Sequence, residues 1–87
     1  MSASHPPPRQ RLAVPDFGIR GVPLTLSLWL VPAGASVTAG DRVAELAAGG
    51  VTIDLESPVS GRLVVQCVDE DETVTTGVVI AEFEVAE

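Results

Sequence analysis

Lysine and tyrosine are absent from this chain of 87 residues, which also holds only one cysteine and one histidine. Five arginines supply all of the strongly basic side chains against twelve Asp and Glu, and the formal net charge is -7. Without lysine, no side-chain amine can be acylated or form a Schiff base, whether codon usage or function explains the absence. The negative charge also disfavours nucleic acid, because its phosphate backbone is bound by basic surfaces. We therefore expect a small acidic protein module with no nucleic-acid partner.

Long apolar segments are missing as well. The longest run, LTLSLWLV, is far shorter than a bilayer requires and is interrupted by Thr25 and Ser27. The opening stretch, MSASHPPPRQRL, lacks the apolar core of a signal peptide. The lone Cys67 cannot form an internal disulfide and fits a reducing compartment. These absences predict a cytoplasmic protein without a membrane partner.

What is present indicates one small domain. Three consecutive prolines with Ser, His and Arg mark residues 1–10 as a flexible tail, because this stretch cannot bury enough apolar surface to order itself. The remaining residues, 11–87, are predicted to form a single domain, since a chain of this length supports only one modest core. β-Branched residues are frequent, Gly or Pro recurs every few residues, and no stretch has the apolar spacing of an amphipathic helix. About eight short strands are expected.

Apolar and polar residues alternate along the predicted strands, as in LTLSLWL and GRLVVQC. This period of two puts Leu24, Leu26, Leu28 and Leu30 on one face of a strand and Trp29 on the other. In the second stretch it puts Cys67 on the inward face, where a free cysteine behaves as a small hydrophobe. Trp29 suits an interface or a covered sheet edge equally well.

The chain repeats itself with a shift of 37 positions. VPAGASVTAGDRVAEL at residues 31–46 aligns with VDEDETVTTGVVIAEF at residues 68–83, and both segments carry V-T-x-G before a short strand. Gly40 and Gly77 are predicted to hold positive φ angles in the equivalent turns. The two halves of the chain thus share one design, and neither contains a predicted helix. We therefore expect two sheets that pack face to face and are related by a pseudo-twofold axis.

Side chains suited to catalysis are scarce. His5 lies in the proline-rich tail, and no basic residue near Cys67 in the sequence suggests a reactive thiolate. Without a dyad or triad on a rigid element, the chain is not expected to be an enzyme and no catalytic residue is assigned.

The acidic run DEDE is the most charged segment of the chain and consists of Asp69, Glu70, Asp71 and Glu72. It lacks the alternating ligands and the glycine of a calcium loop, so a solvated turn is favoured and no metal is expected. Its charge could attract a basic protein at moderate salt. Together with Trp29, the run is our candidate partner surface.

Three segments resemble the biotinyl/lipoyl-domain family. VPDFG at residues 14–18 resembles the opening strand and turn of lipoyl domains, and residues 26–46 resemble their WLVKEGDxVxxGDxLxEI segment. Residues 57–83 resemble their second half, SPxxGxLxxIxVxEGDxVxVGxxL. The resemblance extends over residues 12–85 and implies an all-β fold, a flattened barrel or sandwich of two four-stranded antiparallel sheets with a pseudo-twofold internal repeat, known as the barrel-sandwich hybrid.

The resemblance also implies a missing attachment residue. In that family the hairpin between the two halves carries the lysine that receives lipoate or biotin. Here that hairpin consists of Ala47, Ala48, Gly49, Gly50 and Val51. Counting back from Ser57, the Asp and Lys of the lipoyl motif fall on Gly49 and Gly50, a pair that suits a tight type I′ turn. We therefore expect a degenerate family member without lipoate, biotin or another cofactor.

For function, the resemblance implies a docking or scaffold module that is not lipoylated and does not catalyse a reaction. The expected partner is a dihydrolipoyl-acyltransferase-like enzyme or an acyl-carrier system, with polyketide or other secondary metabolism as the setting. Two alternatives remain at this point. One is a covalent carrier modified at Cys67 or a serine, and the other is an apo barrel-sandwich adaptor module of the kind found in transport systems.

Overall fold

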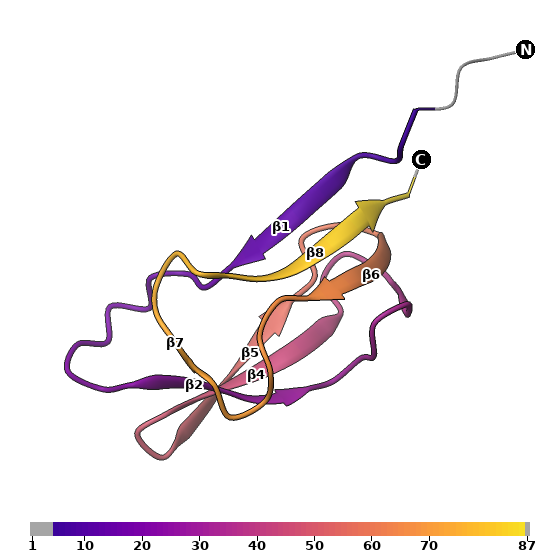
Figure 1. Ribbon diagram of the computed structural model, residues 1–87. Coiled ribbons are helices and arrows are strands. Elements are labelled where there is room, and N and C mark those ends of the chain that lie inside the picture. Colours follow the sequence, from indigo (N-terminus) through magenta and orange to yellow (C-terminus); the bar gives the residue numbers. More distant parts are fainter. Residues whose placement is uncertain (1–4, 87) are drawn as a thin grey trace, which may run out of the picture.

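Eight β-strands build the part of the chain that the computed structural model describes, residues 5–86 (Figure 1). In chain order they are β1 (Arg9–Ala13), β2 (Leu24–Trp29), β3 (Ser36–Val37), β4 (Arg42–Ala48), β5 (Val51–Glu56), β6 (Gly61–Gln66), β7 (Thr73–Val74) and β8 (Val79–Val85). The described residues form no helix, and so none that could cross a membrane. The prediction of an all-β fold is confirmed.

The strands form two antiparallel sheets of four strands each, which do not close into one barrel. One sheet has the order β1-β8-β6-β3, and the other has the order β5-β4-β2-β7. Each sheet therefore combines strands from both halves of the chain, and the two halves of the sequence cannot be separated into two halves of the structure.

The first strand begins earlier than the sequence predicted. β1 starts at Arg9, inside the predicted tail of residues 1–10, because Arg9 pairs with Glu84 on β8. The amide of Val85 also donates to the carbonyl of Pro8 at 2.8 Å. The start of β1 accordingly lies beside the end of β8 in Figure 1. Residues 1–4 of the predicted tail lie outside the described residues.

The internal repeat of the sequence, with its shift of 37 positions, is also present in the structure. Adding 37 to the bounds of β2, β3 and β4 gives the bounds of β6, β7 and β8. The hydrogen bonds obey the same rule: the amide of Leu26 donates to the carbonyl of Glu72, and the amide of Leu63 donates to the carbonyl of Ala35, both at 2.9 Å. β1 and β5 occupy equivalent outer positions in their sheets. The predicted pseudo-twofold repeat is confirmed.

The core lies between the two sheets and contains side chains from both. Its largest fully buried side chains are Phe83, Leu26, Leu46, Leu63, Ile80, Val14 and Val43. Removing this apolar surface from water is the main favourable term in folding. Trp29 is partly buried and packs against this cluster from the end of β2.

Bulges in β2 and β6 reverse the expected facing of several side chains. The register of β2 against β4 shifts between Leu26 and Leu28, and that of β6 against β8 shifts between Leu63 and Val65. An extra residue inverts the alternation of inward and outward side chains beyond it. Leu28 and Leu30 are therefore exposed, whereas Leu26 is buried. The prediction that the four leucines share one face is wrong for Leu28 and Leu30.

Glycine is required where β6 begins. A Cβ atom at Gly61 would collide with the carbonyl oxygen of Glu84 on the neighbouring strand β8. Just before it, the buried Ser57 hydroxyl donates to the carbonyl of Val59 at 2.6 Å, which closes the turn between β5 and β6. The S-P-x-x-G segment at residues 57–61 thus connects β5 of one sheet to β6 of the other through a short turn.

Candidate functional site

The hairpin between β4 and β5 ends in a tight two-residue turn. Ala48 pairs with Val51, and between them Gly49 and Gly50 have φ angles of 55° and 90°. Two positive φ angles define the type I′ turn that the Gly-Gly pair predicted. The tip of the hairpin is exposed and presents no side chain other than the two glycine hydrogens.

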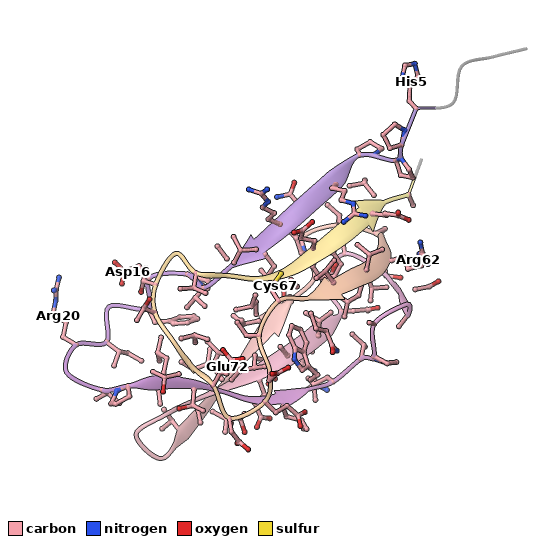
Figure 2. The ribbon with its side chains drawn as sticks, in the orientation of Figure 1. His5, Asp16, Arg20, Arg62, Cys67 and Glu72 are labelled. Carbon is pink, nitrogen blue, oxygen red and sulfur yellow. The ribbon has the colours of Figure 1, made fainter. Side chains whose placement is uncertain are left out.

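Exposed aliphatic side chains surround this tip, and we call the region the hairpin end. Val51 is 57% exposed, and Ile19 and Val22 on the loop between β1 and β2 are 41% and 38% exposed. Val22 lies against the turn, since a Cβ atom at Gly49 would be 3.1 Å from its Cγ1. Figure 2 shows Arg20 extending outward from the same loop. Ile19 and Val22 could not be singled out from the sequence, because loop residues carry no periodic pattern that reveals their neighbours.

A hollow beside the hairpin end continues this surface onto the other half of the chain. It is lined by Ile19, Val22, Pro23, Leu24, Thr73, Val74, Thr75 and Thr76. β7 contributes because it pairs with the start of β2, where Val74 lies opposite Leu24. The hairpin end is therefore an apolar surface formed by segments that lie far apart in the sequence.

Trp29 and the acidic run are in direct contact in the structure. The Trp29 amide donates to Oε2 of Glu70 at 2.9 Å, and its indole Nε1 donates to the carbonyl of Val68 at 3.1 Å. Glu72 accepts the amide of Asp69 at 2.9 Å through Oε1, so part of the charge stabilises the turn itself. Trp29 is therefore only partly buried: one part of the side chain packs on the core, and the rest lies at the surface.

This region forms an open groove of about 550 Å³, which we call the acidic groove. Its lining residues are Trp29, Leu30, Val31, Pro32, Gln66, Asp69 and Glu70. Gln66 occupies the position equivalent to Trp29 and makes the equivalent bond, donating from Nε2 to the carbonyl of Val31 at 3.1 Å. The groove thus lies where the two halves of the repeat meet. Gln66 gave no sign of this role in the sequence alone.

Cys67 is exposed, so its predicted place in the core is wrong. The bulge in β6 is the physical reason, because it inverts the facing of residues beyond Leu63. Partial burial and the nearby Glu82 carboxylate raise the pKa of the Cys67 thiol, against a smaller opposing effect of Arg11. A raised pKa leaves less thiolate at neutral pH and makes the sulfur a weaker nucleophile.

No other group in the described residues suggests catalysis or metal binding. His5 lies at the far end of the molecule from the hairpin end (Figure 2). Residues 5–86 contain no cluster of three or more His, Cys, Asp or Glu side chains that could hold a metal ion.

Comparisons with known proteins identify relatives of this fold. A family model described as "Biotin-requiring enzyme" (Biotin_lipoyl) matches residues 10–83. The dihydrolipoyllysine-residue acetyltransferase component of the pyruvate dehydrogenase complex from Corynebacterium glutamicum is 34% identical over 68 residues, which cover 78% of this chain and 10% of that protein. This chain therefore spans about a tenth of the length of that relative.

A solved structure has the same fold. It is that of a single-chain, multi-domain long-chain acyl-CoA carboxylase, and it matches with a TM-score of 0.76 and 22% sequence identity. The match covers 99% of this chain and 8% of the carboxylase chain. At this identity the likeness supports the fold alone.

The family match corrects the expectation that no cofactor is involved. Domains of this family normally carry covalently attached biotin or lipoate, so family membership implies an attached group where we expected none. The residues at the hairpin tip do not fit an amide-linked group, because Gly49 and Gly50 have no side-chain nitrogen and the 87 residues contain no lysine. No residue of the tip can therefore be assigned as an attachment point.

The fold, the internal repeat and the position of the central hairpin agree with the family match over residues 10–83. Domains of this family are carriers and are not catalytic themselves, which agrees with the scarcity of catalytic side chains. The chain belongs to the biotinyl/lipoyl-domain family.

Proposed function

We propose that this chain is a docking or scaffold module of an acyltransferase-type enzyme complex, and that a partner enzyme recognises its hairpin end. The observation that carries the proposal is the tight Gly49-Gly50 turn with Ile19, Val22 and Val51 exposed beside it. Exposed aliphatic side chains gathered at one end of a small protein are typical of a protein-binding surface. A two-residue turn holds them in a fixed arrangement.

The relatives support an enzyme complex as the setting. One is a component of the pyruvate dehydrogenase complex, and the structural neighbour is a multi-domain carboxylase. The partner that we propose is a dihydrolipoyl-acyltransferase-like enzyme or an acyl-carrier system, in polyketide or other secondary metabolism. Because the proposal concerns protein contacts, it holds whether or not a prosthetic group is attached elsewhere.

The test compares two variants with matched changes. Val51→Glu places a charge at the hairpin end, and Val65→Glu places one on an exposed strand position away from it. Binding of each purified variant to acyltransferases and acyl-carrier enzymes of the source organism is measured by biolayer interferometry. We expect Val51→Glu to weaken binding at least about tenfold, since a buried unpaired charge at an interface costs more than ~1.4 kcal/mol. Val65→Glu should bind as the unchanged chain does.

Two results would overturn this proposal. One is the absence of association with every acyltransferase-type and acyl-carrier enzyme of the source organism. The other is an equal loss of binding in Val51→Glu and Val65→Glu, which would mean that the hairpin end has no special part.

A second candidate function is a covalent carrier modified at a residue other than lysine. The exposed thiol of Cys67 favours it, because the attachment of a group requires access from solvent. The raised pKa of that thiol weighs against a spontaneous reaction. The intact mass of the chain purified from its source organism distinguishes the two candidates: a heavier chain supports the carrier, and the unmodified mass excludes it.

A further inference from the structure

We propose that the acidic groove binds an extended segment of a partner protein in which a basic residue stands next to an aliphatic one. This surface is separate from the hairpin end, so either can fail without the other. The groove combines uncompensated negative charge with apolar side chains, and the equivalent turn of the repeat carries no such charge.

The repeat shows that this fold does not need acidic residues in the turn. The turn of residues 69–72 is equivalent to that of residues 32–35, which reads PAGA and carries no charge. Both turns make the same backbone bonds: Asp71 N donates to Leu26 O and Gly34 N to Leu63 O, each at 2.7 Å. The neutral turn of residues 32–35 therefore shows that these backbone bonds form without any charged side chain.

One of the acidic residues even adopts an unfavourable backbone conformation. Asp71 has a φ angle of 72°, where its equivalent is Gly34 with a φ angle of 94°. A side chain in this left-handed region is strained, although Asp tolerates it better than most residues. The turn would form more readily with glycine, so the fold alone does not explain the acidic sequence.

The negative charge of this turn is not balanced by arginine within the described residues. The ion pairs of residues 5–86 join Arg9 to Glu82, Arg42 to Asp54 and Arg62 to Glu84, and none of these residues lines the acidic groove. Asp69 and Glu70 therefore line the groove as carboxylates open to a cation from another molecule. Charge complementarity of this kind favours a basic partner and raises its association rate.

The groove also contains an apolar surface. Leu30 is 39% exposed at its wall, and Trp29, Val31 and Pro32 lie beside it. An aliphatic side chain would bury apolar area there, while a neighbouring guanidinium or ammonium group could reach the carboxylates of Asp69 and Glu70. An indole face adds attraction for a cation that lies over it. A chain segment with both kinds of side chain fits this groove better than a small ion or a nucleic acid does.

The test uses a capped hexapeptide of alternating leucine and arginine and follows the amide and side-chain signals of the ¹⁵N-labelled chain by NMR. We expect shifts at the Trp29 indole N–H and the Gln66 side-chain amide, and affinity that falls as salt increases. The Asp69→Asn/Glu70→Gln variant should bind at least fivefold more weakly. Both changes keep the shape of the side chains and leave an acceptor for the Trp29 amide.

The matched control is Glu45→Gln/Glu56→Gln, which changes the net charge equally on β4 and β5 and should bind as the unchanged chain does. A peptide with glutamate in place of arginine should not bind. The proposal is overturned if the peptide causes no shifts at the groove, or if both double variants weaken binding equally. It is also overturned if sedimentation shows a dimer that Asp69→Asn/Glu70→Gln abolishes, since a second copy would then occupy the groove.

Discussion

Among the glycines of the described residues, Gly61 is the one where an added methyl group should destabilise the fold most. Its Cβ would meet the carbonyl oxygen of Glu84, which belongs to the backbone of β8 and cannot rotate away. We expect Gly61→Ala to lower the free energy of unfolding by roughly 2–4 kcal/mol, in the upper range of overpacking effects. Urea denaturation followed by the fluorescence of Trp29 measures the change.

Gly34→Ala is the control for that prediction. Gly34 has a positive φ but open space around the Cβ position, so alanine meets conformational strain without a collision. The loss should be about 1–2 kcal/mol. If Gly61→Ala were no more destabilising than Gly34→Ala, the close approach of β6 and β8 would not be as the structure describes it.

Asp71 provides the opposite prediction, a substitution that stabilises. Asp71→Gly puts the residue found at the equivalent position 34 into a backbone conformation that glycine adopts freely. We expect a gain of about 0.5–1 kcal/mol in the free energy of unfolding, reduced by the greater freedom of glycine in the unfolded chain. Thermal denaturation measures it. Asp71→Asn is the control, because it removes the charge but keeps a side chain at this position. If it raised the free energy of unfolding as much as Asp71→Gly does, backbone strain would not be the cause of the gain.

At the scale of elements, the sequence predicted where strands occur better than which way their side chains face. The period of two located β2 and β6, and the repeat predicted the positive φ angles of Gly40 and Gly77 in the equivalent turns. The bulges after Leu26 and Leu63 left no mark in the sequence, because an extra residue in a strand looks the same as any other until its partner strand is known. The misplaced side chains, Leu28, Leu30 and Cys67, all follow a bulge.

The candidate surfaces were predictable to different degrees. Trp29 and the acidic run were grouped because an aromatic side chain and a charged segment are both typical of protein interfaces. The hairpin end could not be assembled from the sequence, since Val22 approaches Gly49 only through the course of an irregular loop. The sequence predicted the turn at Gly49 and Gly50 from the conformational freedom of glycine, but it did not predict the neighbours of that turn.

The pairing of β6 with β8 gives a prediction for acid stability. A hydrogen bond from Arg62 to Glu84, at 2.8 Å, lowers the pKa of this carboxyl in the folded chain, and burial opposes the effect more weakly. A lowered folded-state pKa contributes stability above the ordinary pKa of glutamate, and that contribution is lost as the pH falls through the folded value. The stability difference between the unchanged chain and Glu84→Gln should therefore shrink as the pH falls below the ordinary glutamate range.

Urea denaturation at a series of pH values measures this difference. Glu56→Gln is the control, since Glu56 lies in the other sheet and takes part in none of the ion pairs described for residues 5–86. A difference for Glu84→Gln that stayed constant from neutral pH to the acid limit of folding would mean that the bond to Arg62 does not govern this titration.

At the scale of the whole molecule, the two halves depend on each other for both sheets. β1 and β3 pair with β8 and β6 in one sheet, and β5 and β7 pair with β4 and β2 in the other. A half alone retains one pair of neighbouring strands, β2 with β4 or β6 with β8, and loses the opposite sheet that covers it. Isolated two-stranded ribbons are at best marginally stable in water.

We therefore predict that fragments 1–49 and 50–87 are each unfolded alone and fold when mixed in equal amounts. The cut falls in the exposed Gly49-Gly50 turn, so it removes no core side chain and breaks no pairing beyond the hairpin tip. Far-UV circular dichroism should show strand structure only in the mixture, and the single Trp29 should become shielded from quenchers there. A fragment that folded by itself would contradict this interdependence, because each sheet would then not need strands from both halves.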